Sequence, residues 1–556
     1  MPKRKPIAAI AATLLLAYGG VYLSGYATLA LLHLDTHQLY WHTYLQYLRA
    51  LDLPQVQPYL GRIKLGGALG FGAALVLQAL LLYLLFKPAR KSLHGDARFA
   101  TAADLARQGL FKQGADGIVV GRYNGRLMRL CGQQFAILAA PTRSGKGVGV
   151  VVPNLLEYGE SVVVLDIKQE NFDLTSGWRK SQGQEVFLFN PFAEDRRTHR
   201  WNPLTYVSGD PAFRVSDLMS IAAMLYPDGA DEQKFWVSQA RNAFMAFALY
   251  LFDNHDDEVA TGFPGGGPPT LGGIYRLSSG NGGDPKGFLR GLAARRFLGP
   301  AARSAFSTLL SQADETFASI MGTLKEPLNA WINPVLDAAT AADDFLLTDL
   351  RRKRMTIYVG IQPNKLAEAR LIVNLFFSQI VNLNTRELPR NNPQLRHQCL
   401  LLMDEFTAIG RVDIIATAVA YMAGYNLRLL PIIQSMAQLD AVYGKDVART
   451  IITNHALQIV FAPREQQDAN DYSEMLGYTT YRRRNVSKGR ETTRSVSEER
   501  RALMLPQELK AMGGEREVVL YEGIAHPVMC DKIRYYKDRR FRTRLLPRTD
   551  VPTIAV

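Results

Sequence analysis

A loop containing glycine and lysine, placed between an apolar strand and a helical segment, most restricts how this 556-residue chain can fold. The apolar run 135–139 precedes the loop and an apolar segment follows it, so we expect a strand, a loop and then a helix. Phosphate-binding loops need backbone N–H groups around the anion, a glycine for close approach and a lysine that reaches the phosphate oxygens. The sequence therefore predicts a nucleotide site, with these candidate binding residues: Pro141, Thr142, Arg143, Ser144, Gly145, Lys146, Gly147 and Val148.

Two positions in this loop differ from the usual pattern. Ala140 stands where the first glycine normally lies, and Gly147 stands where a serine or threonine normally gives a hydroxyl to Mg²⁺. Taken alone, the octet 140–147 is also compatible with an ordinary Gly-Lys turn after a buried strand. The residue that completes the magnesium shell is left open.

A second run places two acids at the end of an apolar strand. Residues Cys399–Met403 are continuously apolar, as in a strand buried on both faces, and Asp404 and Glu405 follow directly. In nucleoside triphosphatases the first such acid holds Mg²⁺ and the second polarises the attacking water. We therefore predict Asp404 as the metal residue and Glu405 as a catalytic residue. Strands ending in acids also occur in other α/β proteins, so the order of the two motifs carries the inference.

Two further strands are expected to end near this site. The run 429–433 ends at Gln434, whose amide can sense the γ-phosphate, although a surface glutamine at a strand end is the alternative. The run Ser161–Leu165 ends at Asp166. Asp166 and Lys168 either line the nucleotide pocket or the subunit contact, or are solvated residues at a strand end. This order of motifs predicts an α/β fold, a RecA-like P-loop NTPase core with ligands at the carboxyl ends of a parallel sheet.

Helical patterning replaces the strand signal between residues 206 and 343. The segment 235–252 has the composition of a long apolar helix, and glycine- and proline-rich breaks occur at 262–269 and 280–285. We expect an all-helical insertion over 206–343. Such an insertion on a motor domain usually contacts a substrate or partner, and a structural cap over the ring is the alternative. The nucleotide-binding domain would then comprise 92–205 and 344–556.

The first ninety residues have the composition of a membrane anchor. Residues 7–32 and 65–86 contain no charged side chain, and each run is long enough to cross a bilayer. Basic residues precede the first run and follow the second, which places both ends on the cytoplasmic side. We predict a two-pass anchor over 1–91 with a short periplasmic loop at 33–64. A cleaved signal peptide is the alternative for the first run.

The charge balance and cysteine content limit the partners and the chemistry. The chain has 65 lysines and arginines and 51 acidic residues, which gives a net charge of +14. This excess favours nucleic acid, anionic lipid or acidic protein segments as partners. Three widely separated cysteines argue against a zinc site or a disulfide framework. The basic stretch 481–501 is interpreted as a solvated loop, with nucleic-acid contact as the alternative.

Taken together, these motifs resemble the type IV secretion coupling proteins, the TraG/VirD group of membrane-anchored, ring-forming ATPases. The resemblance runs through almost the whole chain and includes two N-terminal spans. Members of the group often carry Ser-Gly-Lys-Gly, as this chain does at 144–147. The other matching segments are Val164–Asn171, Trp201–Leu204, Met403–Phe406, Gln434–Leu439 and Tyr443–Gly444.

The resemblance implies a bacterial inner-membrane ATPase that uses ATP and Mg²⁺ and works as a homohexamer. It would recruit effector proteins, relaxase–DNA complexes or both to a type IV secretion system, with the helical insertion recognising the cargo. The absence of a long acidic C-terminal tail favours that insertion as the recognition surface, and we favour protein effectors slightly. A double-stranded-DNA translocase of the chromosome-partitioning kind and a non-enzymatic docking receptor are the alternatives.

One position departs from the group. Some members place an arginine finger about eleven residues before the sensor glutamine, where this chain has Ala423. If a finger acts across subunits, another arginine must replace it. We rank Arg428 first, ahead of Arg411 and Arg449.

Overall fold

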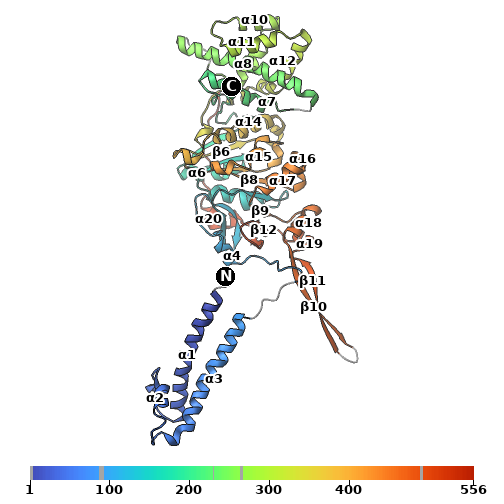
Figure 1. Cartoon of the computed structure of the whole chain (residues 1–556). Helices are drawn as coiled ribbons and strands as arrows, with labels where there is room; N and C mark the ends of the chain where they lie inside the picture. The colour runs from blue at the N-terminus through green and yellow to red at the C-terminus, as the bar shows by residue number, and fades with distance from the viewer. Residues whose placement is uncertain (1–3, 87–92, 229–230, 263–266, 489–491) are drawn as a thin grey trace. The chain divides into compact units, whose positions relative to one another are not determined.

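The computed structural model describes residues 4–86, 93–228, 231–262, 267–488 and 492–556. It divides into an N-terminal unit, Met1–Leu93, and a C-terminal unit, His94–Val556 (Figure 1).

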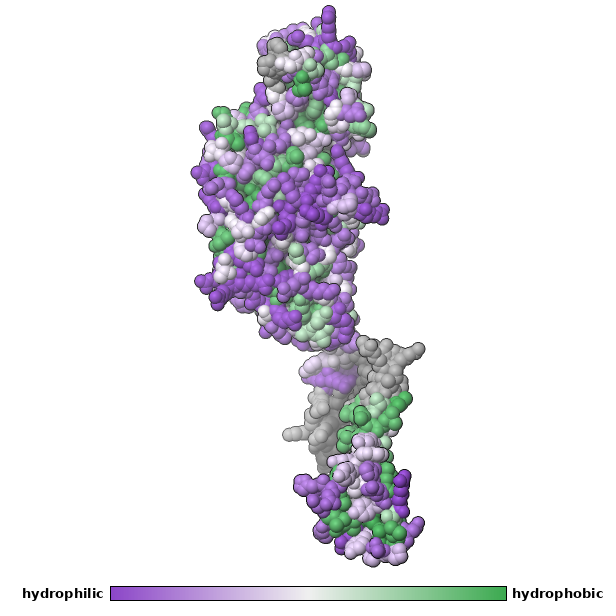
Figure 2. Space-filling view, turned by 90° about the vertical axis from the view of Figure 1, so that its left-hand side faces the viewer, coloured by the Kyte–Doolittle hydropathy of each residue, from purple (hydrophilic) through white to green (hydrophobic). Residues whose placement is uncertain are grey.

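The N-terminal unit is a pair of long apolar helices, α1 (Arg4–Leu31) and α3 (Leu60–Phe86), joined through the short helix α2 (Thr43–Arg49). Glycines let the pair approach closely, because a Cβ at Gly66 or Gly70 would overlap the backbone of α1, whereas the space beside Gly72 is open. Outward-facing apolar side chains such as Leu15 and Val76 are more than 70% exposed, and Figure 2 shows apolar patches on the outside of this unit. This is the surface expected of a lipid-facing helix pair.

Three helices in the described part of the chain are long and apolar enough to cross a membrane. Two of them, Ala9–Leu31 and Gln57–Leu84, belong to the N-terminal unit. The third covers Pro363–Asn384 in the C-terminal unit and is 61% buried, against 28% and 17% for the first two. Its burial identifies the third helix as part of a protein core. The number of spans and the side of the termini stay predictions.

An eleven-stranded mixed sheet organises the C-terminal unit, in the order β2-β1-β13-β12-β9-β3-β8-β7-β4-β6-β5. The seven strands from β9 to β5 are parallel, and the other four pair antiparallel. The parallel strands are continuously apolar because helices cover both faces of this part of the sheet. The strands are β1 (Ile118–Tyr123), β2 (Arg126–Leu130), β3 (Ala136–Ala139), β4 (Ser161–Asp166), β5 (Glu185–Phe189), β6 (Met355–Gly360), β7 (Cys399–Met403), β8 (Leu427–Ile433), β9 (Leu457–Val460), β12 (Arg516–Tyr521) and β13 (Val528–Asp531).

Helix α14 (Leu366–Asn384) is the central helix packed on the sheet. Its Phe376 stacks on Phe189 of β5 at 5.4 Å between ring centroids and meets Trp201 edge-on at 4.8 Å. These contacts explain why an apolar helix of this length lies in a core. The other helices outside the segment between β5 and β6 are α4 (Ala102–Arg107), α5 (Val152–Glu157), α6 (Glu170–Ser181), α15 (Asp413–Ala418), α16 (Met436–Tyr443), α17 (Lys445–Thr453), α18 (Gln466–Met475), α19 (Pro506–Lys510) and α20 (Arg539–Arg542).

Between β5 and β6, the elements in the described ranges are all helical. Helix α8 is the longest of them and extends beyond the expected 235–252, and the break at 280–285 is the connection between α9 and α10. Residues 263–266 of the other expected break lie outside the described residues. The limits 206 and 343 as domain boundaries stay a prediction. The helices are α7 (Pro211–Leu225), α8 (Lys234–Thr261), α9 (Leu271–Ser278), α10 (Pro285–Ala293), α11 (Pro300–Leu310), α12 (Asp314–Leu328) and α13 (Pro334–Ala339).

The basic stretch near the C-terminus forms a two-stranded hairpin, so its interpretation as a solvated loop is wrong. Strands β10 (Tyr478–Lys488) and β11 (Thr492–Ala502) pair antiparallel in a sheet of their own. Arg482 donates to Glu498 directly across the ladder at 2.9 Å, and the Arg500 guanidinium lies 3.5 Å from the Tyr478 ring centroid. Within the C-terminal unit, Figure 1 places this hairpin at the end opposite to helices α8 to α12.

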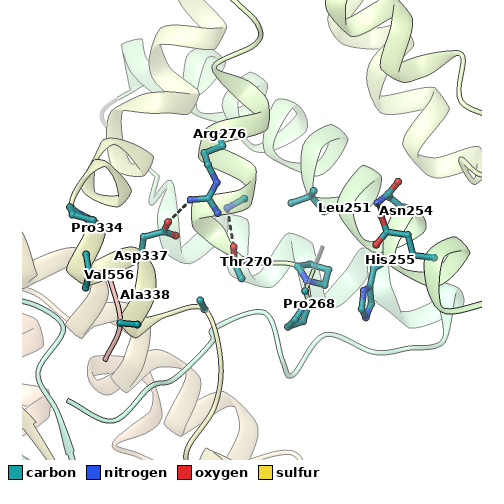
Figure 3. Close-up of a pocket in the computed structure, with 16 residues that line it drawn as sticks. Leu251, Asn254, His255, Pro268, Thr270, Arg276, Pro334, Asp337, Ala338 and Val556 are labelled. Carbon is teal, nitrogen blue, oxygen red and sulfur yellow. Dashed lines mark hydrogen bonds and ion pairs between the residues drawn. The ribbon is translucent and has the colours of Figure 1, made fainter. Parts of the chain in front are cut away.

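The last residues of the chain return to the helical region. The Ile554 N–H donates to the Arg196 carbonyl at 3.0 Å, and Val556 lines a cavity of about 530 Å³ between α8, α9 and α13 (Figure 3). Arg276 and Asp337 form an ion pair at one side of this cavity. The cavity is lined by none of the predicted site residues.

Candidate nucleotide site

The phosphate loop connects β3 to a helical segment that begins at Gly147. The segment starts as a π-helical turn, η3 (Gly147–Val151), and continues as α5, so strand, loop and helix occur in the predicted order. Gly145 has φ of +90°, which a residue with a side chain rarely adopts, so a glycine is needed there. The Ala140 N–H donates to the Ile433 carbonyl at 2.9 Å and ties the start of the loop to β8.

The strand order brings the predicted acids and the glutamine to this loop. Strand β8 lies between β3 and β7, and all three run parallel, so their carboxyl ends meet at one edge of the sheet. Asp404 and Glu405 follow β7, and Gln434 follows β8. These two strand pairings bring Lys146 together with residues that lie about 260 to 290 positions later in the sequence.

A hydrogen-bonded chain joins these side chains. The Lys146 ammonium forms an ion pair with the Glu405 carboxylate and lies 3.5 Å from Oδ1 of Asp404. Nε2 of Gln434 donates to Oε2 of Glu405 at 2.8 Å, while the Thr142 hydroxyl donates to Oε1 of Gln434 at 2.9 Å. Five predicted residues, including one from the exposed part of the loop, therefore meet in one network.

The two neighbouring acids have opposite pKa shifts. Burial raises the pKa of Asp404, the charge of Glu405 adds to the rise, and Lys146 opposes it. Burial also acts to raise the pKa of Glu405, but hydrogen bonds from Lys146 and Gln434 outweigh it and lower the pKa overall. Glu405 thus stays ionised and paired, whereas Asp404 is a part-buried carboxylate that a further cation would stabilise.

The residues fit a phosphate chain and Mg²⁺. Oδ1 of Asp404 and the Ser144 hydroxyl are buried, and neither has a hydrogen-bond partner among the described residues. The space beside Gly147 is open, so no described side chain replaces the missing hydroxyl. The described ranges contain no cluster of three or more histidine, cysteine or acidic residues that could hold a metal. Asp404 would therefore share Mg²⁺ with phosphate oxygens and water, which is the usual arrangement for this ion.

Asp166 lies next to Asp404 but points into its own helix. Its carboxylate accepts hydrogen bonds from the Phe172 N–H at 2.8 Å and from Asn171, at the start of α6. Burial raises the pKa of Asp166 to about 7, against these hydrogen bonds, and the charge of Asp404 adds to the rise. Because Asp166 is 1% exposed, its carboxylate is neither solvated nor in direct contact with the nucleotide pocket.

The structure places Arg428 away from the other predicted residues, where it cannot act as the predicted arginine finger. Arg428 is completely buried at the amino end of β8, whereas Gln434 follows the carboxyl end. Its guanidinium donates to the carbonyls of Gln134, Asp116 and Leu130. A side chain enclosed by its own subunit cannot reach a neighbouring nucleotide, so Arg428 has a structural role.

Sequence reasoning missed three polar residues near the loop. Nε2 of Gln438 donates to Oε1 of Gln434 at 3.2 Å. Gln438 lies four positions after Gln434 at the start of a helix, and this spacing, which brings side chains together, could have identified it. Lys532 donates to the Ser144 carbonyl at 3.4 Å, and Arg534 lies close to Gly145. The alternation of Lys532, Ile533 and Arg534 at a strand end was a weak signal for these two.

Comparisons with known proteins agree with this arrangement. The family model "Type IV secretory system Conjugative DNA transfer" matches residues 94–554. Protein VirD4 of Agrobacterium fabrum is 31% identical over 462 residues, which cover 81% of this chain and 67% of that protein.

Solved structures of the plasmid coupling protein TrwB are similar in fold. The complex of TrwB with the non-hydrolysable ATP analogue ADPNP aligns with a TM-score of 0.56 and 17% identity, over 80% of this chain and 95% of TrwB. The complex with ADP and Mg²⁺ aligns with a TM-score of 0.54 and 19% identity over the same shares. This likeness confirms the predicted RecA-like α/β core with its helical regions.

Proposed function

Because the chain belongs to the type IV secretory system conjugative DNA transfer family, we propose that its nucleotide site hydrolyses ATP with Mg²⁺ to energise transfer. Membership makes the chain a type IV secretion coupling protein with a role in conjugative transfer. Hydrolysis, the metal, the hexamer and the cargo are the finer parts of the proposal. The TrwB complexes with ADPNP and with ADP and Mg²⁺ support the choice of ligands.

The convergence of Lys146, Asp404, Glu405 and Gln434 at one edge of the sheet is the observation that carries the proposal. Lysine, acid and amide come from three separate strand ends and meet beside a glycine-containing loop. An ordinary Gly-Lys turn would not require acids and an amide from other strands at hydrogen-bonding distance. The geometry therefore favours a working nucleotide site over the degenerate site of a docking receptor.

Each residue has a task that its position allows. Lys146 exchanges its Glu405 partner for phosphate oxygens, which frees the Glu405 carboxylate. The freed carboxylate accepts a proton from water at the γ-phosphate, and Gln434, already bonded to Glu405, orients that water. Bound Mg²⁺ would neutralise charge on the phosphate oxygens, with Asp404 holding it.

Two substitutions test the site in the full-length protein purified from membranes. Lys146→Ala should weaken ATP binding by about 10- to 100-fold, because charge-assisted hydrogen bonds to the phosphates are lost. Glu405→Gln should strengthen binding by about five-fold, since the competing ion pair is removed, and lower turnover by at least about 100-fold. Exposed Lys445, at the start of α17, provides a matched control as Lys445→Ala.

Binding and turnover are measured separately, with a fluorescent ATP analogue and by phosphate release. Turnover should be measured with and without DNA, since motors of this kind can be silent unless assembled. Absence of ATP binding in the wild-type chain would favour the docking receptor. Wild-type turnover by Glu405→Gln would remove Glu405 from the mechanism.

We also propose that the chain is a two-pass protein of the bacterial inner membrane with both termini in the cytoplasm. The glycine-packed pair α1 and α3, with its exposed apolar surface, supports this topology. Reporter fusions at the two termini and in the connecting segment near Leu45 provide the test. A periplasmic signal from either terminus would contradict it.

The cargo and the assembly complete the proposal. We expect a homohexamer that recruits effector proteins, relaxase–DNA complexes or both through the helices between β5 and β6. Pulling down partners with the full chain, and with variants of exposed Phe213 and Met219 on α7, would identify the cargo class. Hexamers that move along duplex DNA without secretion partners would instead favour a double-stranded-DNA translocase.

A further inference from the structure

A second group of cations lies against the phosphate loop, on a segment more than 380 residues later in the sequence. Lys532 and Arg534 follow β13, and Ile533 between them is 2% exposed in a small core with Val152 and Phe541. This anchored isoleucine holds the two charged residues in place.

Three consecutive residues of this segment touch the loop and the helix after it. Nζ of Lys532 donates to the Ser144 carbonyl at 3.4 Å. A Cβ added to Gly145 would lie 3.7 Å from the Arg534 guanidinium, and one added to Gly149 would lie 3.5 Å from the Ile533 carbonyl. The segment therefore follows the loop from Ser144 to the first helical turn.

Lys532 is a buried cation without a carboxylate partner. It is 7% exposed, and no ion pair joins it to an acid within the described part of the chain. Its ammonium lies 3.7 Å from the centroid of the Phe461 ring, which follows β9. Burial lowers the pKa of Lys532 to about 8. A buried cation is costly unless an anion accompanies it.

The neighbouring acids do not supply that anion. Glu517 is buried, and burial raises its pKa well above the ordinary value, against the opposing charge of Lys532. Glu515 is largely exposed and pairs with Arg534 at 3.0 Å. Nε of Arg534 is itself buried without a partner among the described residues. The local charge is therefore positive on this side of the loop.

On the opposite side of the loop, the cations already interact with acids. Lys146 faces two carboxylates, Asp404 and Glu405, and the charge of Lys168 also acts on Glu405. A triphosphate carries about four negative charges, and one lysine already shared with two acids balances little of it. Cations from another segment would correct this deficit.

We propose that Lys532 and Arg534 form a second cationic wall of the nucleotide site, which stabilises the bound phosphate chain from within the same subunit. This inference rests on the proposed nucleotide site and adds two binding residues to it. The Ser144 carbonyl and the Phe461 ring hold the Lys532 ammonium in position without cancelling its charge. Phosphate supplies the counter-charge that Lys532 lacks in the protein alone.

The test compares nucleotide binding by full-length variants, with fluorescent ATP and ADP analogues as probes. Lys532→Met keeps the length of the side chain and removes its charge, and should weaken binding of both probes by about ten-fold. Lys532→Arg should restore most of the affinity. Lys537→Met removes a charge from an exposed position five residues on and should leave affinity unchanged.

The salt dependence of binding separates an electrostatic role from a merely structural one. A lost phosphate contact should reduce the slope of affinity against salt concentration, whereas a looser fold would leave the slope unchanged. Equal affinity and equal slope for Lys532→Met and the wild-type chain would overturn the proposal.

Two further outcomes keep this result apart from failure of the nucleotide site itself. If the wild-type chain binds neither probe while its fold is intact, the proposed function fails and not only this inference. If Lys532→Met does not fold, Arg534→Gln serves as the second test, since Arg534 is 23% exposed. Unchanged affinity and salt slope for a folded Arg534→Gln would then overturn the proposal.

Discussion

Replacing the buried arginine of β8 separates a structural role from a catalytic one. Arg428→Met keeps the bulk of the side chain but removes every donor that serves the carbonyls of Gln134, Asp116 and Leu130. The methionine leaves these three oxygens without this partner; the bond to the Leu130 carbonyl is buried and those to Gln134 and Asp116 are part-buried. A hydrogen bond contributes about 0.5 to 1.5 kcal/mol net, so losing the bonds to three carbonyls at about 1 kcal/mol each costs about 3 kcal/mol.

This loss converts into a measurable shift of the melting temperature. The C-terminal unit, His94–Val556, has about 460 residues, and unfolding entropy of about 2.1 cal/mol/K per residue gives about 1 kcal/mol/K for the whole unit. A loss of about 3 kcal/mol then lowers the melting temperature by about 3 °C if the unit unfolds together, and by more if it unfolds in parts. Scanning fluorimetry of the full chain at one heating rate measures the shift.

The control and the refuting result are both specific. Arg352→Met, at an exposed position before β6, should change the melting temperature by less than about 1 °C. In Arg428→Met the fall in stability should accompany any fall in nucleotide binding. An unchanged melting temperature and wild-type nucleotide affinity, together with lost hydrolysis, would refute the structural role and restore Arg428 as a finger acting across subunits.

Three other outcomes follow from the described contacts. Gln434→Ala should lower turnover by at least about ten-fold and change ATP affinity by less than about three-fold, because the amide donates to Glu405 and, in the proposed mechanism, orients the attacking water. Phosphate release and probe binding measure the two effects. Burial raises the pKa of Asp166 in the folded state to about 7, so the folded state keeps a proton that the unfolded state loses. Stability should therefore fall as pH rises from about 4 to 7. Asp166→Asn should flatten this fall in melting temperature with pH. Gly70→Val should separate α1 from α3 and reduce a disulfide crosslink engineered between them, whereas Gly72→Val, with open space beside it, should leave the crosslink unchanged.

Local patterns were enough to predict the elements that carry the site. The apolar runs before Ala140 and before Asp404 became β3 and β7, because strands buried on both faces need continuous apolar residues. The start of α4 follows the same short-range logic, because the Thr101 hydroxyl accepts from the Asp104 N–H three residues on. Each of these signals lies within about ten residues of sequence, where composition and backbone geometry are directly linked.

The hairpin β10–β11 shows where such patterns fail. Burial produces the alternation that identifies a strand, and residues 481–483 of the hairpin, which are all exposed, bury neither face. Tyr481, Arg482 and Arg483 are all exposed and succeed one another without a period of two. The strand pairing with residues 497–499 holds them, and that pairing is not visible in either strand alone.

The role of an arginine likewise depends on contacts that sequence does not display. Arg428 is enclosed by carbonyls of its own subunit, whereas Arg411 is exposed beside Asp413. Arg411 and Arg449 are accessible and stay candidates for a finger.

The sequence by itself determined the chemical groups of this protein: a phosphate loop with Lys146, an acidic pair and two apolar N-terminal helices. These features follow from short-range rules of burial and backbone geometry. Only the tertiary structure decided which groups meet, because the order of strands in a sheet depends on packing over hundreds of residues. It joined Glu405 and Gln434 to Lys146, enclosed Arg428, and laid Lys532 and Arg534 against the loop, since β13 pairs within the same sheet as β3.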